Sequence, residues 1–144
     1  MDKEVLTESL LLVDGQEHAL IPRFYQILFE RYPEVRPMFS DDIEPQVKML
    51  HGSIVAVLDH LHDAAWLGGT LGALGRKHVD LGVTEPMYGA VAECMIAAME
   101  ELGGEAWTPA MTAEWSEALS AVSGLMLAGV PEAEGSVGLD GAKV

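Results

Sequence analysis

Apolar residues in this 144-residue chain recur at intervals of three and four, and strand-like alternation is nearly absent. The β-branched residues stand singly among Leu, Met, Ala and Glu, which are strong helix formers. This periodicity predicts an all-α fold. With 49% hydrophobic residues, the chain is long enough to bury a substantial core, and we expect one domain over residues 1–130. The glycine-rich segment 131–144 is predicted to be a flexible tail.

Turn-forming residues divide the chain into predicted helices. Pro33 and Pro37 bracket a short segment of one or two helical turns. Gly68-Gly69 is expected to be a break, with the next helix beginning near Leu71. Pro22 stands inside the second segment, where it either belongs to the first turn or bends the helix. The predicted helices cover about residues 2–13, 16–32, 33–39, 45–62, 71–80, 85–102 and 109–127.

Charge and composition exclude several classes of function. The formal net charge of −15 repels nucleic acid phosphates and anionic membrane surfaces, whereas small neutral ligands are compatible with it. The single cysteine, Cys94, allows neither an internal disulfide nor a cysteine-based zinc site, and we expect it to be a small core residue. The sequence shows no signal-peptide pattern and no apolar run of membrane-spanning length, which predicts a soluble, cytoplasmic protein.

His78 is the residue most suggestive of chemistry. Its imidazole is predicted to share one helix face with three leucines, while charged residues occupy the opposite face. A histidine on an apolar face needs a partner: it is either a core histidine bonded to a backbone carbonyl, or a metal or haem ligand. The leucines are Leu71, Leu74 and Leu81, and the charged residues are Arg76, Lys77 and Asp80.

Tyr25 and Gln46 are two further polar residues predicted to face the core, each from its own helix. Each could be an ordinary hydrogen-bonded group at a helix packing edge. Together with His78, they place three hydrogen-bonding side chains inward from three apolar helices, as a bundle around a polar-centred cofactor requires. This combination favours a ligand site.

Other site chemistries lack their sequence patterns. The remaining histidines do not form a pair at metal-ligand spacing with carboxylates on one helix face, and no Glu-x-x-His pair supports a dinuclear carboxylate centre. No nucleophile elbow or glycine-rich phosphate loop occurs. The remaining histidines are His18, His51, His60 and His62.

Four segments in the same order resemble a known family. Residues 24–29 (FYQILF) and 32–39 (YPEVRPMF) are followed by residues 74–78 (LGRKH) with Gly82-Val83 and Tyr88, and then by Trp115 with Ala118. They resemble the bacterial single-domain haemoglobins and the globin domains of flavohaemoglobins. The resemblance extends from about Leu6 to Leu127, and it implies a globin fold that holds haem b.

The resemblance also implies a role for each site residue. His78 would be the proximal iron ligand, while Tyr25 and Gln46 would face the bound gas. The remaining residues would contact the haem: Phe39 on its face, Leu50 above the iron, Val83 and Tyr88 on the proximal side, and Lys77 or Arg76 at a propionate. Where flavohaemoglobins place a glutamate near the end of the last helix, this chain has Val130, with Glu132 two residues further on.

Several functions are compatible with such a site. Reversible binding of dioxygen, nitric oxide or carbon monoxide needs only the globin domain, whereas nitric oxide dioxygenation would also need an external reductase. Whether the protein is an enzyme therefore stays open. Two alternatives use the same fold differently: a haem-free signalling module in which His78 is a core histidine, and a gas sensor coupled to a partner.

Overall fold

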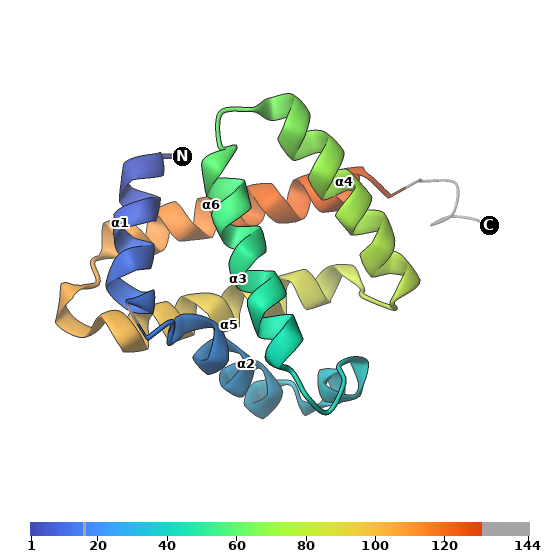
Figure 1. The fold of residues 1–144 in the computed structure, drawn as a ribbon, viewed down its shortest axis with the longest axis horizontal. Helices are drawn as coiled ribbons and strands as arrows, with labels where there is room; N and C mark the ends of the chain where they lie inside the picture. The colour runs from blue at the N-terminus through green and yellow to red at the C-terminus, as the bar shows by residue number, and fades with distance from the viewer. Residues whose placement is uncertain (16, 131–144) are drawn as a thin grey trace.

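The computed structural model describes residues 1–15 and 17–130, and all regular elements within these ranges are helices (Figure 1). The all-α prediction is confirmed. Residues 131–144, which carry the predicted tail and Glu132, lie outside the described residues. The elements are α1 (Lys3–Asp14), α2 (Leu20–Arg31), the 3₁₀ helix η1 (Pro33–Met38), α3 (Glu44–Asp59), α4 (Ala64–Asp80), α5 (Glu85–Gly103), the 3₁₀ helix η2 (Gly104–Ala106) and α6 (Pro109–Ala128).

Capping side chains fix where several helices begin. The Asp2 carboxylate accepts from the amide of Glu4 at 3.0 Å, and the Thr108 hydroxyl accepts from Met111 N at 3.2 Å, as N-caps do. Pro22 lies in the first turn of α2, where its missing N–H leaves no hydrogen bond unmade. Of the two positions that the sequence allowed for Pro22, the first turn or a bend inside the helix, the structure shows the first turn.

The predicted break at Gly68-Gly69 is wrong, because α4 begins at Ala64 and runs through both glycines. The Asp63 carboxylate accepts from the amide of Trp66 at 3.0 Å and caps the helix, so α4 begins seven residues before the predicted start near Leu71. Glycine weakens a helix by only about 1 kcal/mol relative to alanine, so a good cap and favourable packing can override it.

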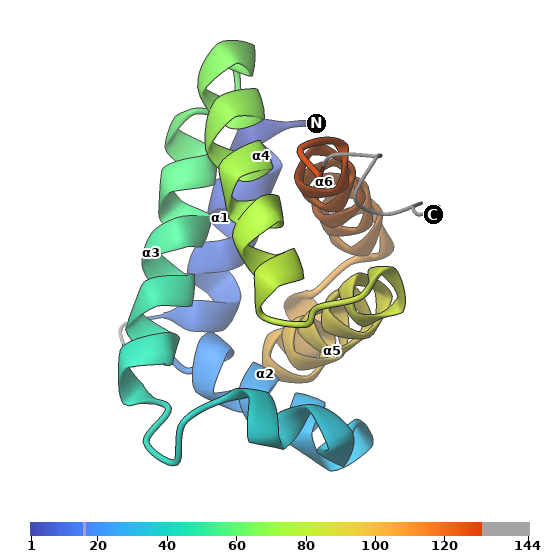
Figure 2. The ribbon, with the colours of Figure 1, turned by 90° about the vertical axis from the view of Figure 1, so that its right-hand side faces the viewer.

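Two of the three main helix pairs join helices that are distant in sequence. The main pairs are α2 with α5, α4 with α6, and α5 with α6 (Figures 1 and 2). The α4–α6 pair is very close, because Gly75 lies directly against the backbone of Met126 and Gly72 lies against Gly129. A methyl group at Gly75 would collide with the backbone of Met126, whereas one at Gly72 would only touch Gly129. None of the described helices is long and apolar enough to cross a membrane.

The core lies between α1, α2, α5 and α6. Leu6, Phe24 and Met99 are fully buried there, and Cys94 is also fully buried, which confirms it as a core residue. One polar pair is included: the indole N–H of Trp115 donates to the Ser9 hydroxyl at 2.7 Å. This bond satisfies both buried groups and links α6 to α1.

The two helices α3 and α4 are arranged differently from the core helices. In Figure 1 they meet at the connection between them and diverge from there. Their partners also differ, since α3 packs on α1 and α2 while α4 packs on α6. The start of α3 and the end of α4 therefore lie at the wide end of this pair, next to η1 and α5.

Candidate functional site

His78 lies in the last turn of α4, at the wide end of the α3–α4 pair, and is half-buried. Its Nδ1 lies 2.8 Å from the carbonyl oxygen of Leu74, one turn earlier. A carbonyl can only accept, so Nδ1 carries the proton and Nε2 of the neutral ring has a free lone pair. His78 therefore bonds a backbone carbonyl through Nδ1, as a core histidine would, and it can still bind a metal through Nε2.

Tyr25 is almost fully buried, with 2% of its surface exposed, and its ring belongs to an aromatic cluster. Its centroid lies 4.9 Å from that of Phe24, 5.7 Å from Phe29 and 5.6 Å from Phe39. These contacts fix the ring of Tyr25 at the junction of α2 and η1.

The side chain of Gln46, in the first turn of α3, lies within reach of the Tyr25 hydroxyl. Burial raises the pKa of the Tyr25 phenol, and the approach of the Gln46 side chain only partly opposes this rise. The phenol therefore stays protonated at neutral pH and can act as a donor. The two polar residues predicted to face a common ligand are brought together by α2 and α3.

Four apolar or aromatic residues predicted to line the site are half-buried. Phe39 and Leu50 pack against the edge of the core near Tyr25. On the other side, the ring of Tyr88 at the start of α5 lies nearly parallel to that of His78, with the centroids 6.3 Å apart. Val83 follows α4, and its amide donates to the carbonyl of His78 at 2.9 Å. Two of these residues thus lie beside the core near α2 and α3, and the other two lie beside His78 at the end of α4.

The two basic residues before His78 take different positions. Arg76 donates to the carbonyl oxygen of Gly129 at 3.1 Å and is thereby directed toward the end of α6. Lys77 is exposed. Lys77 forms no side-chain hydrogen bond with the described residues, so of the two it is the better candidate to pair with an anionic group of a cofactor.

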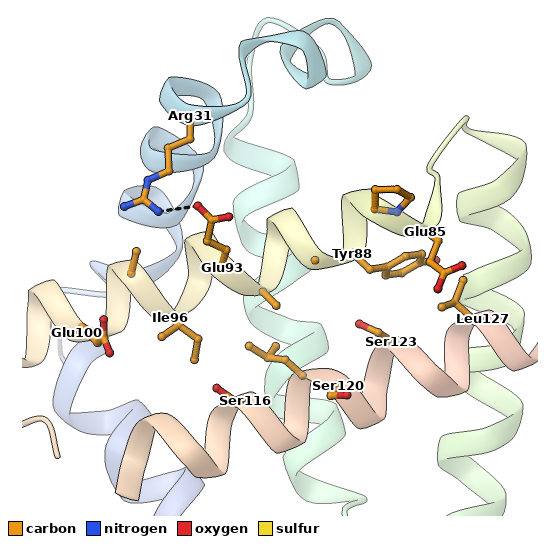
Figure 3. Close-up of a pocket in the computed structure, with 15 residues that line it drawn as sticks. Arg31, Glu85, Tyr88, Glu93, Ile96, Glu100, Ser116, Ser120, Ser123 and Leu127 are labelled. Atoms are coloured by element: carbon orange, nitrogen blue, oxygen red, sulfur yellow. Dashed lines mark hydrogen bonds and ion pairs between the residues drawn. The ribbon is translucent and has the colours of Figure 1, made fainter. Parts of the chain in front are cut away.

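A groove of about 940 Å³ lies between α5 and α6 (Figure 3). Its lining includes Tyr88, three serines of α6 and the ion pair of Arg31 with Glu93, whose Nη1 and Oε2 lie 2.8 Å apart. His78, Tyr25 and Gln46 are not part of this lining. The groove therefore shares Tyr88 with the site around the ends of α3 and α4, but it does not contain the three polar residues of that site.

The sequence analysis considered histidine pairs on a single helix face, and the structure brings two of the remaining histidines together from different elements. His18 and His51 are far apart in sequence, but both approach the carboxylate of Asp14. Spacing within one helix cannot reveal such a group, because its members come from α1, the α1–α2 connection and α3. His60 is different: it stacks on Trp66 with centroids 3.8 Å apart.

A family model for the globins matches residues 22–126, which is most of the chain and includes every predicted site residue. The chain belongs to the globin family. Its all-helical architecture and the predicted resemblance to bacterial single-domain globins are confirmed with it. The family implies haem and diatomic gas ligands as the chemistry to consider.

Curated relatives place this globin beside the flavohemoproteins. It is 28% identical to the flavohemoprotein of Pseudomonas putida over 129 residues, covering 87% of the globin and 33% of the relative. It is 32% identical to that of Pseudomonas aeruginosa over 139 residues, covering 94% and 34%. The globin therefore spans about a third of the length of these relatives.

Two solved structures have the same fold. The bacterial globin of Campylobacter jejuni superposes with a TM-score of 0.77 at 22% identity, covering 93% of this globin and 97% of that chain. An engineered carbene transferase, made from a putative nitric oxide dioxygenase of Rhodothermus marinus, gives 0.73 at 25% identity, covering 86% and 87%. At 22% identity, the likeness to the Campylobacter jejuni globin shows the fold alone.

Proposed function

We propose that this globin holds haem b through Nε2 of His78 and reversibly binds dioxygen and other diatomic gases beside Tyr25 and Gln46. The observation that carries this proposal is the bond from His78 Nδ1 to the Leu74 carbonyl. It fixes the tautomer and the ring orientation, as partners of metal-binding histidines do. It also leaves Nε2 as the nitrogen that can bind iron.

The donor set suits haem with one protein ligand. Haem held by a single imidazole provides an open coordination position for a small gas molecule. On the proposed gas side, the Tyr25 hydroxyl and the Gln46 amide would donate to the negative end of a polarised ligand. Both groups are uncharged, and the raised pKa of Tyr25 keeps its proton in place at neutral pH.

The surrounding side chains would complete the pocket. Phe39 and Leu50 would exclude water from the gas side, which strengthens hydrogen bonds made there. Val83 and Tyr88 would pack on the proximal side, and Lys77 would pair with a haem propionate. Half-burial of these apolar groups fits this role, since a flat apolar cofactor would cover the surface that remains exposed.

The test is the visible absorption spectrum of the purified protein, recorded ferric, dithionite-reduced and reduced with carbon monoxide. Wild type is compared with His78→Ala and with His60→Ala. His60 is a matched control, because its Nδ1 also lies 2.8 Å from the carbonyl one turn earlier and its ring is also half-buried.

We expect a Soret band that shifts with carbon monoxide in wild type and His60→Ala, and its loss or alteration in His78→Ala. Absence of a Soret band in wild type after hemin is added would instead support a haem-free module. Equal spectra of wild type and His78→Ala would remove His78 as the ligand.

Nitric oxide dioxygenation is a second candidate function. It is favoured by the likeness to a putative nitric oxide dioxygenase and by the flavohemoprotein relatives. An external reductase would have to return the iron to the ferrous state after each turnover. Nitrate production from nitric oxide and oxygen, measured with and without an added flavin reductase, tests this candidate. Sustained turnover only with the reductase would support it, and a single turnover in both cases would leave gas binding as the function.

A further inference from the structure

A group of three potential metal ligands lies away from the proposed haem site. Asp14 ends α1, His18 follows in the α1–α2 connection, and His51 comes from the middle of α3. We propose that these three residues bind one divalent transition-metal ion, with Zn²⁺ as the reference ion. Two imidazoles and one carboxylate form a ligand set that suits zinc and its neighbours better than calcium or magnesium.

The distances agree with coordination of a single ion. Oδ2 of Asp14 lies 3.1 Å from Nδ1 of His18 and 3.1 Å from Nε2 of His51. One ligand atom of each residue lies within 4.8 Å of the other two. In a tetrahedral zinc site with bonds of about 2.0 Å, neighbouring ligand atoms are about 3.3 Å apart. Small side-chain rotations would therefore bring all three atoms around one ion.

The carboxylate of Asp14 is already held in place for such a role. Only 7% of the residue's surface is exposed, and its second oxygen, Oδ1, accepts from the amide of Leu20 at 3.2 Å. A hydrogen bond of this kind to a ligating carboxylate fixes its orientation. Oδ2, in contrast, is shared by two imidazoles, so a bound ion would replace two hydrogen bonds to one atom by coordination.

The backbone of His18 provides an independent indication. Its φ of +52° lies in the left-handed region, which side chains with a Cβ rarely adopt, and it is the only non-glycine residue there among the described residues. Such strained residues occur preferentially at functional sites. Here the strained conformation accompanies an imidazole that lies beside the buried carboxylate and next to His51, with the ring centroids 5.0 Å apart.

The site is open on one side. The His18 side chain is 67% exposed and that of His51 is 34% exposed, so water can supply a fourth ligand. Neutral histidines can bind the ion by moving their proton to the other ring nitrogen, so binding requires no charged histidine. The bound ion would join α1, the α1–α2 connection and α3 into one unit.

Isothermal titration calorimetry with zinc chloride tests the proposal on the purified protein as isolated, with and without haem. Wild type is compared with His18→Ala, His51→Ala and His62→Ala. His62 is an exposed histidine outside the group and serves as the matched control. We expect wild type and His62→Ala to bind one equivalent of zinc. His18→Ala and His51→Ala are expected to bind at least tenfold more weakly.

A thermal melt separates loss of the site from loss of the fold. Because His18 is largely exposed, His18→Ala should melt like wild type without metal and should fail to gain the zinc-dependent rise in melting temperature. Absence of zinc binding in wild type, or equal affinity of wild type and His18→Ala, would overturn the proposal. Neither readout depends on haem, so this outcome is separate from that of the gas-binding test.

Discussion

Helices α2 and α3 both carry apolar side chains toward the core, but their surroundings are very different. Six of the twelve residues of α2 are buried, among them Phe24 and Tyr25. Of the sixteen residues of α3, only Leu58 is buried. The apolar residues of α3 that face inward, such as Leu50, are half-buried at the edge of the core.

The two helices thus mark two kinds of region: one whose apolar side chains are fully buried by the protein itself, and one whose apolar side chains stay partly exposed. Around α2, side chains of α1 and α5 fill the space, so burial is complete without any other molecule. Around the diverging ends of α3 and α4, apolar groups stay partly exposed, and His78 Nε2 forms no hydrogen bond with any of the described residues. Exposed apolar surface around a few polar groups is typical of ligand sites. The predictions below test this contrast.

The largest effect is expected for Phe24→Ala in the closed core. Phe24 is 1% exposed, so truncation leaves a cavity and should lower the free energy of unfolding by about 3–5 kcal/mol. Leu50→Ala on α3 should cost only about 1 kcal/mol in the haem-free protein, because its side chain is already partly hydrated. Urea unfolding followed by circular dichroism measures both values. Equal losses would show that the two regions do not differ in packing.

A smaller loss is expected where α4 meets α6. A methyl group at Gly75 would collide with the carbonyl of Met126, so Gly75→Ala should destabilise the protein by about 1–3 kcal/mol. It should also weaken haem retention, because the shift of α4 displaces His78. Gly69→Ala is the matched control on the same helix: nothing lies near its added methyl, and it should stabilise the helix by up to about 1 kcal/mol. Thermal melts and hemin-transfer rates, measured in parallel, compare the two variants. Identical behaviour of both would contradict the prediction.

The next effect concerns function and leaves stability nearly unchanged. Tyr25→Phe removes one neutral donor, worth about 1 kcal/mol, so dioxygen should dissociate roughly five- to tenfold faster. The control is Tyr32→Phe, whose hydroxyl donates to Glu93 Oε1 at 2.6 Å on the outer surface. Stopped-flow dissociation kinetics distinguish the two tyrosines. Unchanged kinetics in Tyr25→Phe would exclude this phenol from the gas site.

The smallest effect is expected at the surface. The hydroxyl of Tyr32 and then the guanidinium of Arg31 hold the pKa of Glu93 below its usual range. A lowered carboxyl pKa contributes stability above the ordinary value of about 4.3 and loses it as the pH falls through the lowered value. Glu93→Gln should therefore remove a slight acid-side slope from the stability of wild type. Because the Glu93 side chain is 46% exposed and its charge is screened by water, we expect a change near the detection limit. A large change would show that surface charge, not the core, controls this region.

Much of the fold was predictable because its signals are local. The three- and four-residue periodicity specified helices, and Asp2, Thr108 and Pro109 specified where two of them begin. The start of α4 was not predictable in this way. Two adjacent glycines at 68 and 69 suggested a break, but the cap at Asp63 and the packing of α4 on α6 outweigh their low helix propensity.

The candidate site divides in the same manner. His78 could be singled out because a polar residue on a leucine stripe is visible in the sequence. The resemblance of residues 74–78 to bacterial globins then suggested that it is the iron ligand. The bond to Leu74 that leaves Nε2 free also follows from helix geometry. The meeting of Tyr25 with Gln46 required the packing of α2 on α3.

The sequence alone therefore determined the helices, their caps and the inward direction of single polar side chains, since each depends on residues within about one turn. Only the tertiary structure decided which of these side chains meet. His51 lies 37 residues from Asp14 along the chain, and their contact depends on where α3 crosses α1. The crossing of α4 and α6 likewise depends on the close approach of Gly75 to Met126, and a periodic pattern carries no information about such approaches.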